Sequence, residues 1–131
     1  MGTTKYQIYT QEQIEMARLF KALAHPARLA IVENVLRYDS ISGKDLQFYI
    51  ALSQSTISKH LKELYVAGII DVRADGNKSI YSIKKMALVE ITKCLDRFIT
   101  EHDRKKFNGL YVEFSKFTSI VYPDFKLKSS S

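Results

Sequence analysis

The pattern of apolar residues predicts two helices near the start of the chain. Thr10 is a good N-cap, and Gln13 three residues later can complete a capping box. His25-Pro26 ends this first helix, because proline disfavours helix in the residue before it but suits the first turn of a new one. The second helix is expected from Pro26 to about Arg37. The expected apolar faces are Ile14, Ala17, Phe20, Leu23 and Ala24 in the first helix, and Leu29, Val32 and Leu36, with Ile31 and Val35 beside them, in the second.

A third and a fourth helix follow a breaker region at Tyr38 to Asp45. The third is short, around Lys44 to Ala51. The fourth is the stretch SQSTISKHLKEL, which opens with Ser53 as a natural N-cap and ends before Gly68. One face of this helix is apolar, formed by Ile57, Leu61 and Leu64. A second face carries hydroxyl groups and lysines without an acidic residue, at Ser55, Ser58, Lys59 and Lys62.

After Gly68 the period of the pattern changes from helix to strand. Apolar residues alternate on both sides of Asp75-Gly76-Asn77-Lys78, and an Asp-Gly pair between two β-rich runs is a strong hairpin signal. A long amphipathic helix is then expected from Lys84 to about Lys106, and a last helix from Leu110 to before Pro123. The expected apolar side of the long helix is Leu88, Ile91, Leu95, Phe98 and Ile99. The fold class is therefore mainly α with a β-hairpin, in the order α-α-α-α-β-β-α-α.

Two short helices followed at once by a β-hairpin predict a winged helix-turn-helix. The major groove of B-DNA admits one α-helix, whose exposed N-terminal residues reach the base edges. In the stretch 53–64, Gln54 can pair with adenine through two hydrogen bonds, and Lys59 and Lys62 can meet phosphate or guanine. A polar helix face with lysines is usually only solvated. The acid-free face, the preceding short helix and the following hairpin together favour DNA binding.

The hairpin adds basic residues to this surface. Its tip is expected to carry Arg73, Asn77 and Lys78 towards the adjacent DNA backbone or minor groove. Contacts of this kind position a protein on DNA and make its affinity depend on salt, rather than specifying sequence.

Composition changes this picture only slightly. The 131 residues carry a formal net charge of +6 with a pI near 9.4, which favours nucleic acid weakly when taken alone. The single cysteine, Cys94, cannot form a disulfide within the chain, and we expect it in the core or at an interface. No apolar run is long enough to span a bilayer, and residues 1–16 lack the apolar core of a secretory signal. A cytoplasmic protein is expected.

The sequence also resembles a known family. LFKALAHPARLAIVENVL (19–36) resembles the opening motif of the ArsR/SmtB family of bacterial winged-helix repressors, and residues 52–83 resemble its recognition helix and wing. The resemblance covers roughly residues 10 to 105. It implies a homodimeric transcriptional repressor that binds double-stranded DNA at an inverted-repeat operator. The matching positions for contacts in the major groove are Gln54, Ser55, Thr56, Ser58 and Lys59, with His60 nearby, and those of the wing are Arg73, Asn77 and Lys78.

The family is best known for metal sensing, but its ligands do not match this chain. One family site uses cysteines on the helix before the recognition helix, and GKDLQFYIAL (43–52) has none. Another begins with Asp and His after the wing, where Lys84, Lys85 and Met86 offer poor ligands for a divalent cation. We expect no metal and no other cofactor. No acid, base and nucleophile are assembled, so we expect no enzyme.

The C-terminal segment is rich in aromatic residues. FNGLYVEFSKFTSIVYPDFKLK (107–128) holds six of the fifteen aromatic residues of the chain. We divide the chain into a DNA-binding and dimerisation domain, residues 1–106, and a C-terminal extension, residues 107–131. The extension is expected to pack on its own domain or on the dimer. The alternative function is a winged-helix module in which this extension binds an apolar ligand or a partner protein, and the effector, whether small molecule or protein, stays open.

Overall fold

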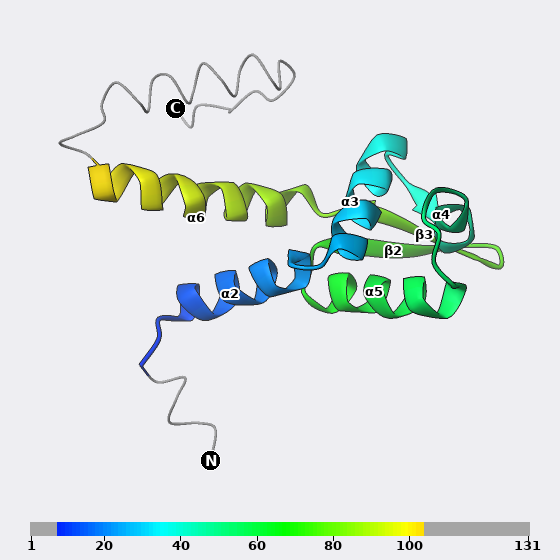
Figure 1. The fold of residues 1–131 in the computed structure, drawn as a ribbon, viewed down its shortest axis with the longest axis horizontal. Coiled ribbons are helices and arrows are strands. Elements are labelled where there is room, and N and C mark those ends of the chain that lie inside the picture. Colours follow the sequence, from blue (N-terminus) through cyan, green and yellow to red (C-terminus); the bar gives the residue numbers. More distant parts are fainter. Residues whose placement is uncertain (1–7, 104–131) are drawn as a thin grey trace. The chain divides into compact units, whose positions relative to one another are not determined.

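Helices make up most of the described chain, and a small sheet lies among them (Figure 1). The protein is represented by a computed structural model, which describes residues 8–103. Contacts divide the chain into two units, Met1–Thr92 and Lys93–Ser131, with the boundary inside the last described helix. In chain order the described elements are α2 (Gln11–Leu23), α3 (Pro26–Tyr38), β1 (Ile41–Ser42), α4 (Gly43–Tyr49), α5 (Gln54–Val66), β2 (Ile70–Asp75), β3 (Lys78–Ile83) and α6 (Lys85–Asp103).

Local side chains determine where the first helices begin. Thr10 Oγ1 accepts a hydrogen bond from the Gln13 N–H at 3.1 Å, and Gln13 Oε1 accepts one from the Thr10 N–H at 2.9 Å. This capping box and Pro26 in the first turn of α3 confirm the two predicted starts. Ser42 Oγ caps α4 by accepting from the Asp45 N–H at 3.0 Å.

The sheet has three antiparallel strands in the order β1-β3-β2. The predicted hairpin is confirmed, with Asp75 opposite Lys78 and a two-residue turn between them. Gly76 has a positive φ of 63° and Asn77 does not, which is the pattern of a type II′ turn. The predicted element order was wrong at β1. This strand has two residues, too few for alternation to reveal it, and it forms by pairing with β3.

The core of the unit Met1–Thr92 lies where α3, α4 and α5 meet the sheet. Its fully buried large side chains are Ile31, Val35, Leu46, Ile57, Leu64, Ile69 and Ile70. Burial of one such side chain stabilises a fold by about 1.5–3 kcal/mol. Helix α3 contacts both α5 and β3, and α5 contacts α4 and β2. This packing fixes α5 in the domain along one side only.

The predicted apolar faces of α2 and α3 were partly wrong. In α2 the buried residues are Met16, Leu19 and Ala22. In α3 they are Ile31, Val32 and Val35, while Leu29 and Leu36 are 47% and 46% exposed. Apolar residues occur on more than one side of each helix, so periodicity alone admits several faces. The tertiary contacts of α3 with α5 and β3 select the face that is buried.

Helix α6 crosses the boundary between the two units. In the first unit Ala87 and Ile91 are buried. In the second, Cys94 is buried, as expected, whereas Leu95 and Phe98 of the predicted apolar side are exposed. The predicted helix from Leu110 and the whole C-terminal extension lie outside the described residues. Among helices of residues 8–103, none combines the length and the apolar character needed to cross a membrane.

Candidate nucleic-acid interface

The first turn of α5 is held by a group of hydroxyls. Ser53 Oγ accepts a hydrogen bond from the Thr56 N–H at 3.3 Å, which confirms Ser53 as the N-cap. The same oxygen lies 2.8 Å from Thr56 Oγ1 and 3.2 Å from Ser55 Oγ. These three side chains therefore stabilise one another, and the start of α5 is ordered by its own sequence.

One face of α5 is buried, and this burial orients the rest of the helix. Ile57, Leu61 and Leu64 are 1%, 3% and 0% exposed, as the sequence predicted. Residues at the opposite face are exposed to solvent: Gln54, Ser55, Ser58, Lys59 and Lys62. The acid-free face predicted from the sequence is therefore an accessible surface of a rigidly packed helix.

The exposed side chains of α5 are available to a ligand. The amide of Gln54 takes no hydrogen-bond partner within the part of the chain that the structure describes. Within that same part, neither Lys59 nor Lys62 forms an ion pair. Chemically, this surface offers an amide that can both donate and accept, short hydroxyls, and two unneutralised ammonium groups. Such groups suit base edges and phosphates.

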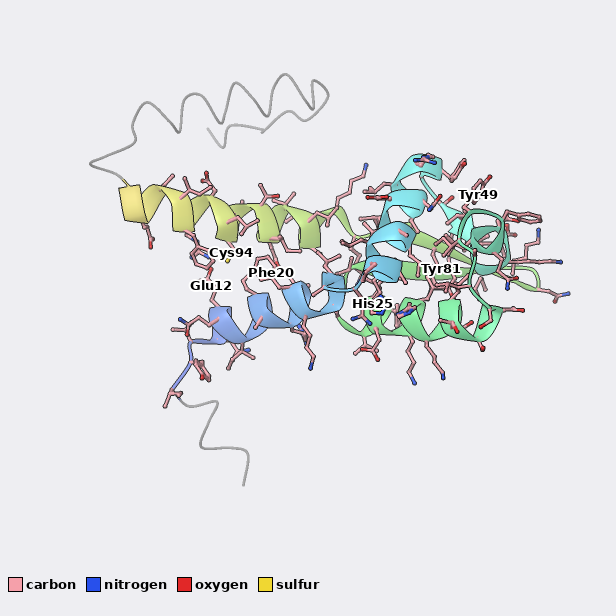
Figure 2. The ribbon with its side chains drawn as sticks, in the orientation of Figure 1. Glu12, Phe20, His25, Tyr49, Tyr81 and Cys94 are labelled. Atoms are coloured by element: carbon pink, nitrogen blue, oxygen red, sulfur yellow. The ribbon has the colours of Figure 1, made fainter. Side chains whose placement is uncertain are left out.

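His60 also lies on α5 and is half-buried. Its ring contacts the ring of His25, with centroids 4.4 Å apart and planes tilted by 45°. His25 is labelled in Figure 2. His25 is the N-cap of α3, and its Nδ1 accepts from the Ala27 N–H at 3.0 Å. Burial, followed by the charges of His25 and Arg28, lowers the pKa of His60, and the Glu63 carboxylate opposes this shift. The ring of His60 thus joins α5 to the start of α3.

The wing carries its polar residues on an exposed hairpin. Asn77 and Lys78 lie at the turn and are exposed. Arg73 was expected at the tip with them, but the structure places it inside β2, opposite Ile80 and two residues before the last residue of the strand. The register of the hairpin, with Asp75 opposite Lys78, accounts for this difference. At the base of the wing, Lys84 Nζ lies 4.0 Å from Asp71 Oδ1.

Two features of the domain were not predicted from the sequence. The first is the role of His25 as a helix cap, for which a histidine directly before Pro26 at the helix start was the available signal. The second is a group of aromatic side chains beside the wing, Tyr38, Phe48 and Tyr49, of which Phe48 is 80% exposed. The available signal was the aromatic residues at the start of the breaker region and shortly after it.

The side chains that commonly bind metal ions do not cluster in the described part of the chain. Within residues 8–103 no three His, Cys, Asp or Glu side chains are grouped so that they could hold a metal ion. The two histidines that do meet, His25 and His60, lie beside the guanidinium of Arg28, whose positive charge opposes cation binding.

The order α4, short loop, α5 and β-hairpin, with an exposed polar face on α5, defines a winged helix-turn-helix domain. A family model described as "Bacterial regulatory protein, arsR family" matches residues 25–72. The chain is 40% identical over 75 residues to Rv0081, an uncharacterised HTH-type transcriptional regulator of Mycobacterium tuberculosis. This match covers 57% of the chain and 66% of Rv0081, just under two thirds of that protein.

Other relatives are covered more completely. The arsenical resistance operon repressor of Staphylococcus xylosus is 32% identical over 82 residues, with 63% of this chain and 78% of the repressor covered. Among solved structures, the ArsR-like transcriptional regulator from Rhodococcus sp. RHA1 has a TM-score of 0.67 at 23% identity, with 85% and 96% of the two chains covered, and it supports the fold. The chain belongs to the arsR family of bacterial regulatory proteins.

Proposed function

We propose that the chain is a cytoplasmic transcriptional repressor that binds an inverted-repeat operator in double-stranded DNA as a homodimer. Its role is regulatory rather than enzymatic. The observation that carries the proposal is the exposed polar and basic face of α5, on a helix whose other face is buried. This face is formed by Gln54, Ser55, Ser58, Lys59 and Lys62. Relatives described as regulators and as an arsenical resistance operon repressor support the proposal.

In this proposal α5 enters the major groove, and its N-terminal half contacts the bases. Gln54 pairs with a base edge, with Ser55, Thr56 and Ser58 as short donors and acceptors. Lys59 and Lys62 contact phosphate or guanine. His60 positions α5 through its contact with His25. In the complex it also meets the backbone of the DNA.

The wing supplies further contacts in the same proposal. Asn77 and Lys78 at the turn, and Arg73 within β2, meet the DNA backbone beside the groove. These contacts hold the domain in register on the duplex and contribute affinity without sequence preference.

The proposal is tested by substitution on the exposed face of α5. Fragments of genomic DNA bound by the chain at physiological salt are first recovered and sequenced to identify the operator. Gln54→Ala and Lys59→Ala should then each weaken operator binding, with about 1–3 kcal/mol lost where a bidentate base contact is removed. Both side chains are exposed, so thermal melting should be unchanged.

Lys21→Ala serves as the matched control, because Lys21 is an exposed lysine on α2 rather than on α5. It should bind the operator as the unsubstituted chain does. If Gln54→Ala and Lys59→Ala both bind with unchanged affinity in mobility-shift assays, α5 does not contact the DNA as proposed.

A further inference from the structure

An open pocket of about 420 Å³ lies beside the wing, and no residue of α5 lines it. This volume falls in the range of about 300–1,000 Å³ that is usual for small-molecule sites. Its walls come from the end of α3, from β1, α4 and the two strands of the wing. The residues that bear on its chemistry are Tyr38, Ser42, Asp45, Phe48, Tyr49 and Arg73.

The strand register explains how Arg73 comes to line this pocket. Ser42 on β1 and Arg73 on β2 are both paired with Ile80 on the central strand β3. Residues directly opposite each other in antiparallel strands project from the same face of the sheet. Ser42, Ile80 and Arg73 therefore form one row across the sheet, and all three line the pocket.

Aromatic side chains form a second wall. The rings of Tyr38 and Tyr49 are stacked, with centroids 4.8 Å apart and planes 29° from parallel. The neighbouring Phe48 is 80% exposed, and Tyr38 and Tyr49 are 42% and 51% exposed. Three large rings gathered at the mouth of one pocket leave apolar surface in water, and burial of such surface by a ligand ring is favourable.

Opposite charges lie on different walls of the pocket. The Arg73 guanidinium comes from the wing and the Asp45 carboxylate from α4. The two do not form an ion pair, since the ion pair found within residues 8–103 joins Lys84 to Asp71. The pKa of Tyr49 is raised, chiefly by its interaction with the Tyr38 hydroxyl and to a smaller extent by the negative charge of Asp45. The charge of Asp45 therefore also acts on the aromatic wall. A ligand with one anionic and one cationic group complements both walls.

We propose that this pocket binds a small aromatic zwitterion, with an aromatic α-amino acid as the ligand class. The ring packs against Tyr49 and Phe48, the carboxylate faces Arg73, and the ammonium group faces Asp45. Ser42, whose Oγ caps α4, also lines the site. The assignment goes beyond the proposed function and does not depend on it, because no residue of α5 lines the pocket and binding is tested without DNA. Arg73 is the one residue that the two proposals share.

The test uses three matched probes and the full chain without DNA, with binding measured by isothermal titration calorimetry. Phenylalanine carries both charges, 3-phenylpropionate lacks the ammonium group, and phenethylamine lacks the carboxylate. Phenylalanine should bind at least tenfold more tightly than either of the other two. No saturable binding of phenylalanine, or equal affinity for the three probes, would overturn the proposal.

Two substitutions test which pocket residue contacts each charged group of the ligand. Arg73→Met should reduce the affinity for phenylalanine to that for phenethylamine, and Asp45→Asn should reduce it to that for 3-phenylpropionate. Arg18→Met, at an exposed arginine on α2, is the control and should bind phenylalanine normally. Retention of normal phenylalanine binding by Arg73→Met contradicts the proposed site.

A third substitution keeps the test valid if Asp45→Asn destabilises α4, where Asp45 lies in the first turn. Phe48→Ala removes a side chain that is already 80% exposed, so it should fold normally. It should weaken phenylalanine binding at least threefold. Unchanged binding by this variant also counts against the site.

Discussion

The contact between His25 and His60 joins a helix cap to the proposed DNA-binding helix. His25 Nδ1 accepts from the Ala27 N–H, so the neutral form of this ring caps α3. The ring of His60, on α5, lies against it at 4.4 Å. Arg28 adds a positive charge to the same environment. Burial, with the nearby positive charges, therefore favours the neutral form of His60.

This environment predicts a loss of stability in mild acid. The pKa of His60 is lowered in the folded protein, chiefly by burial, whereas a histidine in the unfolded chain titrates near 6.5. Below about pH 6.5 the unfolded chain therefore binds a proton that the folded chain does not, and the free energy of unfolding falls as pH falls through this window. Urea unfolding at pH 7.5 and pH 5.5 measures this fall.

His60→Gln is the informative variant for that measurement. It removes the titrating group but keeps a polar side chain of similar size, so its free energy of unfolding should fall less between pH 7.5 and pH 5.5. The same pH dependence in His60→Gln and in the unsubstituted chain would mean that His60 does not titrate in this window.

At the level of the helix, Ser53 caps α5 and also lies at the end of α5 that is proposed to contact DNA. Ser53→Ala removes the acceptor for the Thr56 N–H and should lower the free energy of unfolding by about 0.5–2 kcal/mol. Ser53→Asp keeps an N-cap acceptor, so stability should be retained. The added negative charge would face DNA phosphates in the proposed complex, so Ser53→Asp should bind the operator more weakly. Urea unfolding and mobility shifts separate these two effects, and a stable Ser53→Asp with full affinity would argue against DNA near this end of α5.

For the wing, the prediction concerns the affinity for any duplex and its dependence on salt. Lys78 lies at the exposed turn of the hairpin. In the proposed complex its ammonium group contacts phosphate and not a base. Lys78→Ala should weaken binding to operator and to unrelated duplex by the same factor, and should lower the slope of log affinity against log salt by about one. Titrations at several salt concentrations measure the slope. Loss of affinity for the operator alone would instead make Lys78 a base-specifying residue.

The elements that sequence predicted well are those whose signals are local. Ser53, the Ile57-Leu61-Leu64 face and Gly68 define α5 from within the stretch itself, and Gly68 has the positive φ of 82° that a helix-ending glycine provides. The strand β1 and the buried side of α3 depend instead on partners far along the chain. Leu29 and Leu36 are as apolar as Val32, and packing on α5 and β3 decided which side became buried.

In the whole molecule, the two candidate sites also differ in whether they are built from local sequence or from distant parts of the chain. The proposed DNA-contacting surface is mostly continuous in sequence, so the local pattern of residues was enough to predict it. The pocket beside the wing combines residues of α3, β1, α4 and both wing strands, which only the folded chain brings together. Arg73 illustrates the difference. The sequence predicted it at the tip of the wing, whereas the strand register pairs it with Ile80, which also pairs with Ser42.

The central claim is that the exposed face of α5 lies in the major groove and that two copies bind an inverted repeat. Cys94 is the sole cysteine of the chain, so Cys94→Ser gives a background in which one new thiol can be labelled. Ser58→Cys in this background places that thiol in the middle of the exposed face. Labelling it with an iron chelate that cleaves DNA locally then reports where α5 lies, with the free chelate as control.

Two clusters of cleavage are expected in the operator, each centred on a major groove and separated by about 10 bp, one turn of the duplex. The labelled chain must still shift the operator in a mobility assay, so that cleavage is read from an intact complex. Cleavage that is absent or uniform along the operator while the complex forms would contradict the placement of α5 in the groove.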